Sequence, residues 1–157
     1  MKKINYNIVE QGDWLIPYKC DEPHQVKKVS YQEEPAGKWT VITFSGEGFW
    51  GTWYYPTSCT PIPITEDFLL LNGFTQNGIS QDATNESDRT YDTYVWSQGS
   101  CENDDKVKVC LNIDHHQKNC IVEIFTPDMH VSGLMIQYVN ELQHCLRLCR
   151  INKDIVI

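Results

Sequence analysis

The nearest approach to a catalytic signature in this sequence is the segment NELQH at residues 140–144. It differs from the zinc-protease motif H-E-x-x-H only at its first residue. That motif needs two imidazoles one helical turn apart, which hold the metal while the intervening glutamate activates water. Asn140 is a poor replacement for the first imidazole. The segment therefore predicts the exposed surface of a helix, on which loss of the Glu141 side chain is nearly neutral.

A second candidate for metal binding is the pair His115 and His116, which lies between Cys110 and Cys120. Imidazole and thiolate are both zinc ligands. In a hairpin whose loop is centred just after this pair, however, Cys110 faces Glu123 and not Cys120, so the four side chains do not converge. We therefore expect two histidines in an exposed turn and no metal site.

Other catalytic chemistry has little support in the sequence. It contains no G-x-S-x-G nucleophile elbow, no P-loop and no G-x-G-x-x-G fingerprint. The seven cysteines are an odd number with no C-x-x-C pair, which indicates thiols and no disulfide framework. We therefore assign no catalytic residue, no metal ligand and no cofactor, and we expect a protein that is not an enzyme.

Charge is distributed unevenly along the chain. The 157 residues include 13 basic and 21 acidic side chains, which give a net charge of −8. Between residues 66 and 105 there are nine acidic residues and a single base, Arg89, so this segment alone accounts for the net charge. It disfavours direct binding to nucleic acid and attracts a protein with a basic surface. The candidate partner-binding residues are Asp82, Glu86 and Asp88; alternatively, the segment only solvates the chain.

Aromatic residues are densest between residues 39 and 55. The cluster considered for binding consists of Trp39, Phe49, Trp50, Trp53, Tyr54 and Tyr55. Alternation along strands sends some of these rings to each face of a sheet, so some reach the surface. Aromatic side chains contribute much of the binding energy at protein interfaces, which makes Trp50, Trp53 and Tyr55 further candidates for partner binding. The alternative is that these rings fill a small core.

The first half of the chain has the composition of short β-strands. Runs rich in Val, Ile, Thr and aromatic residues cover residues 25–31, 38–44 and 49–55, and turn-forming residues separate them. An earlier strand is expected over residues 12–17. Four or five such strands are enough for an antiparallel barrel that leaves no exposed edge. We therefore predict an SH3-like β-barrel over residues 1–60.

Residues 61–157 are predicted to form a second module of helices and strands. Its first helix is expected at residues 65–73, where Thr65 is a good N-cap and Gly73 suits the left-handed position after the last turn. Residues 75–90 are polar and rich in turn-forming residues, and they predict a long loop.

The rest of this module is predicted to be a small antiparallel sheet and a second helix. The expected strands are residues 91–96, 107–113 and 120–125. The expected helix covers residues 137–150, where apolar residues at three- and four-residue steps form one stripe that docks on the sheet. The predicted fold class is therefore α+β, with two modules or one compact unit.

The sequence also bears on the location of the protein. Its longest strongly apolar run, Phe68 to Leu71, is far shorter than the roughly 20 residues of a membrane-spanning helix. The opening residues Met1-Lys2-Lys3 lead into polar residues and not into the apolar part of a signal peptide. We therefore expect a cytoplasmic protein that does not bind membranes.

Two segments together resemble a known group of proteins. These are PIPITEDFL at residues 61–69 with NGF at 72–74, and YVNELQHCLRLC at residues 138–149. They are similar to "IPLTEE-L-NGF" and "YVHELQHALRLCGI" in small uncharacterised proteins of Bacteroidetes phages and prophages, crAss-like phages included. The likeness spans most of the chain except its acidic middle. This sequence differs at Asn140, where the group often has His, and at Arg150, where Gly is usual.

The resemblance implies a phage origin and a fold, and it carries over no catalytic residue. Together with the charge, it leads us to expect a non-enzymatic phage accessory protein, an acidic protein-binding module that inhibits a basic host or defence-system protein which normally binds nucleic acid. The alternative is a structural or virion-associated subunit, which would form homo-oligomers through an apolar interface. An enzyme of unknown chemistry is the third hypothesis.

Overall fold

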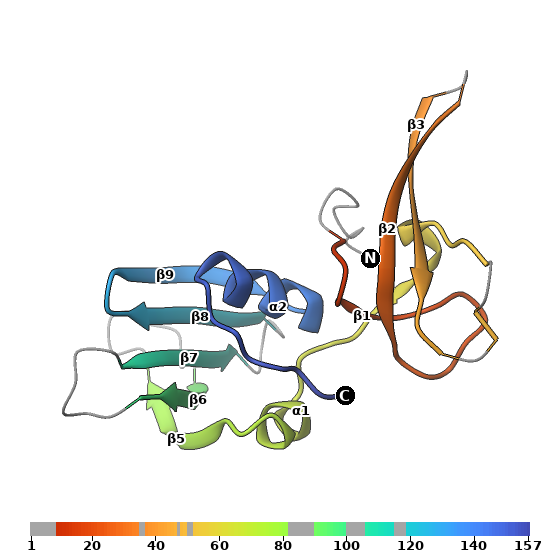
Figure 1. The fold of residues 1–157 in the computed structure, drawn as a ribbon. Helices are drawn as coiled ribbons and strands as arrows, with labels where there is room; N and C mark the ends of the chain where they lie inside the picture. Colours follow the sequence, from red (N-terminus) through yellow and green to blue (C-terminus); the bar gives the residue numbers. More distant parts are fainter. Residues whose placement is uncertain are drawn as a thin grey trace. The chain divides into compact units, whose positions relative to one another are not determined.

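The chain forms two compact units, each with its own antiparallel sheet (Figure 1). The computed structural model describes residues 9–34, 37–46, 48–49, 52–81, 90–99, 106–114 and 119–157. The first unit comprises Met1–Pro63 with Tyr138–Asn140, and the second comprises Ile64–Gln137 with Glu141–Ile157. The polypeptide therefore returns to the first unit for three residues late in the sequence.

The predicted fold class is wrong. The described residues are mostly antiparallel β, with 51% of them in strands and 16% in helices, and the two sheets are open. In the described part of the chain no closed barrel is present. The SH3-like barrel expected over residues 1–60 is replaced by a sheet of four strands in the order β3-β2-β1-β4.

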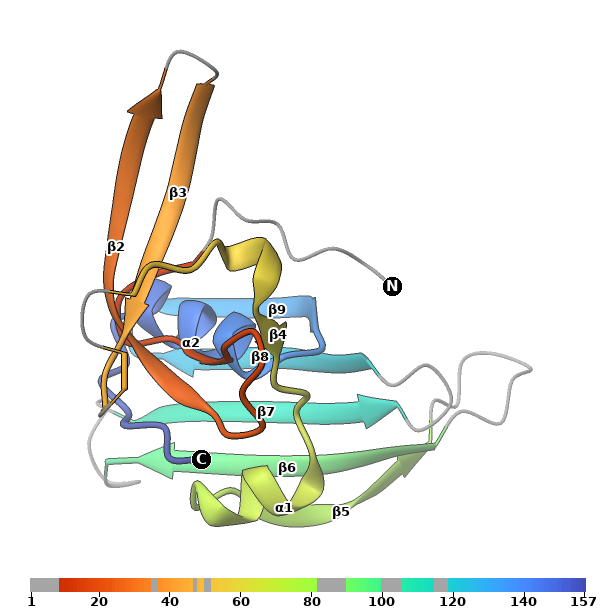
Figure 2. The same cartoon turned by 90° about the vertical axis from the view of Figure 1, so that its right-hand side faces the viewer.

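In the described part of residues 49–55, the last strand that the barrel needs does not form. The four strands are β1 (Trp14–Ile16), β2 (His24–Glu34), β3 (Gly37–Phe44) and β4 (Thr60–Pro61). Of the described residues in the expected strand 49–55, only Tyr54 pairs, through an isolated bridge to Ile42. Pro56, which has no backbone N–H, then begins a short 3-10 helix, η2 (Pro56–Ser58). Figure 2 shows β2 and β3 continuing as a long two-stranded ribbon.

The core of the first unit lies on one side of this ribbon. Alternate residues of β2 and β3 point to it, including Val26, Ile42 and Phe44. Leu15 and Phe49 also belong to this cluster. Past this cluster no described residue forms a core against the ribbon, and Tyr31 is 78% exposed although it lies on the same side of β2 as Val29.

The second unit contains a five-stranded sheet and both α-helices. The strand order is β5-β6-β7-β8-β9, so every strand pairs with its neighbours in sequence. The elements are α1 (Glu66–Leu71), β5 (Thr75–Gln81), β6 (Thr90–Gln98), β7 (Val107–Asp114), β8 (Asn119–Thr126), β9 (Met129–Ile136) and α2 (Val139–Leu148). No helix in the described residues is long and apolar enough to cross a membrane.

Helix α1 has the caps that the sequence predicts. Thr65 accepts a hydrogen bond from the backbone N–H of Phe68 at 3.2 Å through its hydroxyl oxygen. After the last turn Gly73 has φ +74°, a conformation that favours glycine, and the N–H of Phe74 donates to the carbonyl of Leu69 at 3.0 Å. Because these signals are local, they were readable without knowledge of the tertiary structure.

Of the loop predicted over residues 75–90, residues 82–89 lie outside the described residues, and residue 90 begins β6. Residues 75–81 instead form strand β5. Its sequence, TQNGISQ, has no alternation of apolar and polar residues. The strand lies at the edge of the sheet and pairs only with β6. The register shifts between Gln76 and Ile79, where Gly78 has φ +117°. Strand β9 lies at the other edge, and it too contains a glycine with positive φ, Gly133.

Helix α2 packs its apolar stripe as predicted, since Leu142 and Leu146 are buried. Figure 1 shows the helix running along β8 and β9. The expectation of an exposed surface at residues 140–144 is wrong, because Asn140, Gln143 and His144 are also buried. An apolar stripe identifies one buried side of a helix but does not show that the remaining sides face solvent.

Glu141 is also more than a surface residue. Its carboxylate accepts a hydrogen bond of 2.7 Å from the backbone N–H of Gln137, just before the first turn of α2. This is close to a capping-box contact, in which an acidic side chain satisfies an N–H that the helix leaves without a partner.

We therefore expect Glu141→Ala to lower the free energy of unfolding by about 1 kcal/mol, a typical value for a lost cap. Glu141→Gln keeps an acceptor at the same place and is the matched control, with a smaller expected loss. Urea unfolding monitored by circular dichroism measures both. Equal stability of Glu141→Ala and the unchanged protein would show that the contact contributes nothing.

The C-terminal segment after α2 is held by α1 and the sheet. The side-chain amide of Asn72 donates to the carbonyl of Val156 at 2.8 Å and accepts from its N–H at 2.8 Å. The ammonium of Lys153 lies 4.6 Å from the ring centre of Trp96 and 5.6 Å from that of Phe74. These contacts join residues more than 50 positions apart, and the sequence contains no local signal for them.

Candidate functional site

The structure describes only part of the predicted site. Trp53 and Tyr55 are described, and both lie in the first unit between β3 and η2. Trp50, and the acidic candidates Asp82, Glu86 and Asp88, lie outside the described residues. The geometry therefore bears on the aromatic half of the prediction.

Pairing with β3 sets the direction of the two rings. Ile42 and Tyr54 exchange two backbone hydrogen bonds of 2.9 Å, and both side chains pack in the core of the first unit. Neighbouring residues in extended backbone point to opposite faces. Trp53 and Tyr55 therefore point away from this core, to the side of β3 that also bears Trp39.

These three side chains form what we call the aromatic face: Trp39, Trp53 and Tyr55. They are 44%, 45% and 52% exposed, respectively. The rings of Trp39 and Tyr55 meet edge to face, with centroids 6.2 Å apart and an interplanar angle of 66°. Val41, on the same side of β3, is only 3% exposed. Each ring is thus partly fixed by neighbours and partly open to solvent, as the anchors of protein interfaces are.

A small cavity adjoins this face. It has a volume of about 230 Å³ and lies between the start of β2 and the end of β3. Its lining combines three aromatic rings with two lysines, a threonine and a glycine: Phe44, Phe49, Trp53, Lys27, Lys28, Thr43 and Gly46. Ligand pockets of small molecules are commonly about 300–1,000 Å³, so this cavity suits a single side chain of a partner.

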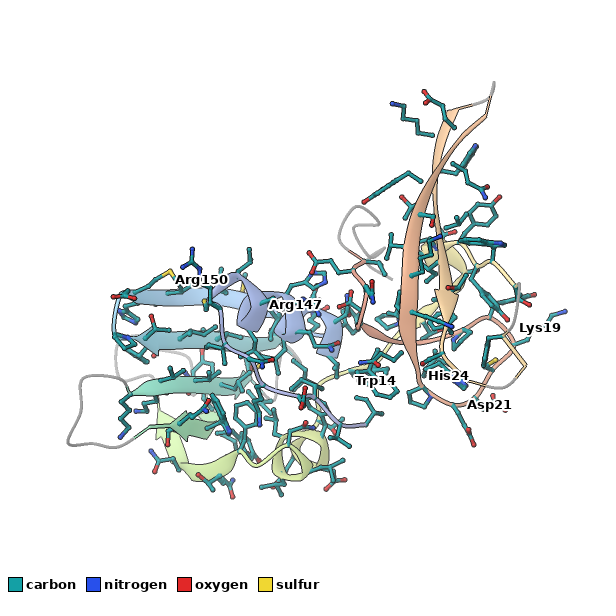
Figure 3. The ribbon with its side chains drawn as sticks, in the orientation of Figure 1. Trp14, Lys19, Asp21, His24, Arg147 and Arg150 are labelled. Atoms are coloured by element: carbon teal, nitrogen blue, oxygen red, sulfur yellow. The ribbon has the colours of Figure 1, made fainter. Side chains whose placement is uncertain are left out.

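A bulge in β2 brings the two lysines to the cavity. The pairing with β3 shifts between Val26 and Lys28, so Lys27 is an extra residue in the strand. The ammonium of Lys28 lies 5.9 Å from the ring centre of Trp53. Close by, the ring of His24, labelled in Figure 3, packs on Phe49 at 4.4 Å between centroids. The aromatic face thus has a cationic side.

Gly46 shapes the same cavity. Its φ of +118° is one that side chains rarely adopt, and a Cβ there would meet Nδ1 of His24 at 3.6 Å. The distance is an ordinary contact, so the backbone conformation is the reason for the glycine.

The candidate metal ligands do not converge in the described part of the chain. Cys110 pairs with Glu123, which confirms the predicted register of β7 and β8. Cys120 instead pairs with Ile113, and it therefore lies on the other face of the sheet. His115 and His116 lie outside the described residues. Among the described residues, no group of three or more His, Cys, Asp or Glu side chains is placed to hold a metal ion.

The described cysteines are free thiols, and most of them are buried. Burial is the main cause that raises the pKa of Cys120 to about 12 and the pKa values of Cys59 and Cys145 to about 11. Thiolate is the reactive form of cysteine, so these three side chains are poor nucleophiles at neutral pH.

We therefore expect iodoacetamide at pH 8 to modify Cys59, Cys120 and Cys145 about 100-fold more slowly in the native protein than in the unfolded chain, because thiolate and access are both reduced. Cys20, which is half-buried, is the internal reference. Mass spectrometry of peptides after timed labelling measures the rates. Similar rates in buffer and in urea would contradict the burial of these thiols.

Three residues of the candidate site were not chosen from the sequence: Trp39, Lys27 and Lys28. Trp39 was recognised in the aromatic cluster, and its alternation with Val41 and Thr43 in one strand was a readable signal that it shares a face with them. The two lysines gave no such signal, because a bulge cannot be located from one strand alone.

Comparisons of the chain with protein-family models, with curated proteins and with solved structures find no match.

Proposed function

We propose that this chain is a non-enzymatic protein-binding module whose contact surface is the aromatic face of the first unit. The observation that supports it most is the partial exposure of Trp39, Trp53 and Tyr55 beside a cavity of side-chain size. Rigid aromatic rings lose little conformational entropy on binding and bury much area, which is why they dominate interfaces.

The chemistry of the cavity narrows the group that it accepts. Its rings favour an apolar or aromatic side chain of the partner, and the ammonium groups of Lys27 and Lys28 favour a carboxylate next to that side chain. Stacked nucleobases are a poorer fit, because the chain has a net charge of −8 that opposes a phosphate backbone.

A second candidate surface is the acidic segment 66–105. Its nine acids against one base would attract a basic protein, and such a partner could be a host or defence-system protein whose nucleic-acid surface the segment occupies. The resemblance to phage proteins is consistent with an inhibitor of this kind. In this case charge would govern the rate of association, and added salt would slow it.

A comparison of two variants separates these candidates. The partner is captured by the immobilised chain, identified and purified, and its association is followed by surface plasmon resonance. We expect Trp39→Ala/Tyr55→Ala to weaken binding at least 30-fold, about 2 kcal/mol, through faster dissociation. Asp82→Asn/Glu86→Gln/Asp88→Asn should change chiefly the association rate.

The opposite pattern would reject the aromatic face. If the acidic triple variant no longer binds while the aromatic double variant binds normally and remains folded, the acidic segment is the contact surface. If no partner is captured and the purified chain is a stable homo-oligomer, the structural-subunit alternative replaces both candidates.

A further inference from the structure

The second unit contains a larger cavity that belongs to neither surface described above. Its volume is about 730 Å³, within the range of small-molecule sites. It lies where β6 ends, β7 begins, the turn between β8 and β9 passes, and α2 gives way to the C-terminal segment. All the residues that line it are described, and all belong to the second unit.

Two opposite charges line this cavity. Arg150 follows the C-terminal end of α2, as labelled in Figure 3, and Asp128 lies in the turn between β8 and β9. Both side chains are exposed, and neither has an ion-pair partner among the residues that the structure describes. A guanidinium is suited to bind a carboxylate through two parallel hydrogen bonds, and a carboxylate is suited to accept from an ammonium group.

The rest of the lining is mixed, since Gln98, Thr126 and Asn152 are polar and the other residues are apolar. Val107, Met129, Leu148 and Ile151 contribute to it, and Met129 and Leu148 are themselves exposed. A ligand with an apolar body would therefore cover hydrophobic surface that now faces water.

The backbone at Arg150 favours a different residue. The N–H of Ile151 donates to the carbonyl of Leu146 at 2.9 Å, and the N–H of Arg150 donates to that of Arg147 at 2.9 Å, a Schellman-type helix end. Arg150 has φ +58°, where glycine is usual and other residues are strained. The helix end alone does not explain an arginine at this position, which is one of the residues that line the cavity.

We propose that this cavity is a binding site for a small zwitterion with an apolar body, namely a free aliphatic or aromatic amino acid. The ligand's carboxylate pairs with Arg150, its ammonium group pairs with Asp128, and its side chain covers the apolar lining. The proposal goes beyond the protein-binding function and does not depend on it.

The first test is calorimetric titration of the full chain with L-leucine and with two analogues that each lack one charge. These are 4-methylpentanoate, without the ammonium group, and isopentylamine, without the carboxylate. L-phenylalanine is titrated in the same way. We expect leucine or phenylalanine to bind, and we expect each leucine analogue to bind at least 10-fold more weakly than leucine. Equal binding of leucine and its analogues, or no binding of either amino acid at millimolar concentration, would overturn the proposal.

The second test uses variants of the two charges. Arg150→Gly is expected to raise the melting temperature by about 2–6 °C, because it relieves the strain at a positive φ, and to weaken leucine binding at least 10-fold. Asp128→Asn should weaken binding to a similar extent without changing the melting temperature. Glu22→Gln, an exposed substitution in the first unit, is the control that changes neither. Normal leucine binding by Arg150→Gly and Asp128→Asn would overturn the assignment even if the unchanged protein binds leucine.

Discussion

Replacing Trp53 by alanine is expected to weaken partner binding by about 30- to 1,000-fold while the protein stays folded. This corresponds to about 2–4 kcal/mol, the range of a central aromatic residue in an interface. Trp53 belongs to the aromatic face and also forms a wall of the adjoining cavity, so its removal affects both. Because the side chain is 45% exposed and does not belong to the core cluster, its loss should cost little stability.

Tyr31→Ala is the matched control for this prediction. Tyr31 is an aromatic residue of the same unit and is 78% exposed, but the pairing of β2 with β3 places it on the opposite side of the ribbon from Trp39. The Tyr31→Ala variant should bind the partner as the unchanged protein does. If Tyr31→Ala and Trp53→Ala weaken binding equally, the contact is not specific to the aromatic face. If neither has an effect, the face is not used.

The largest expected effect on stability is that of Leu142→Ala in α2. Leu142 is 0% exposed, so truncation removes apolar contacts and leaves a cavity, which typically costs about 2–5 kcal/mol. Leu148→Ala in the same helix is the matched control, because its side chain is 79% exposed and should change stability by less than about 0.5 kcal/mol.

Denaturant unfolding of the two leucine variants measures this difference. A loss of equal size at both positions would show that the effect comes from helix propensity and not from burial. A loss at Leu148 that exceeds the loss at Leu142 would mean that α2 presents its other side to the sheet.

Local signals in the sequence predicted several elements correctly. Helix α1 was readable from Thr65 and Gly73, because caps act within a few residues of each other. The pairing of Cys110 with Glu123 followed from the length of one hairpin. The buried stripe of α2 followed from the spacing of its apolar residues.

The elements that were missed depend on partners distant in sequence. Alternation cannot reveal an edge strand such as β5, which has few apolar residues. The barrel was predicted from strand number alone, although closure also needs a last strand that pairs. Among the described residues of the expected strand, only Tyr54 pairs. The contacts of Asn72 with Val156 span 84 positions, and no sequence pattern near either residue predicts them.

The candidate site was predicted in the same uneven way. Trp53 and Tyr55 were chosen because aromatic residues are common at interfaces, and the bridge between Ile42 and Tyr54 gives their direction. The lysines beside them became visible only with the register of β2 against β3. Composition can therefore suggest which residue types bind, whereas strand register decides which of them share a face.

The proposed contact surface is the aromatic face. Hydrogen–deuterium exchange of the free and the bound protein tests this contact, because exchange slows where a partner covers or stabilises the backbone. We predict that binding slows exchange in residues 39–44 and 52–55 and leaves β5 to β9 unchanged. Protection confined to the acidic segment 66–105, with no change at residues 39–44 and 52–55, would contradict the claim.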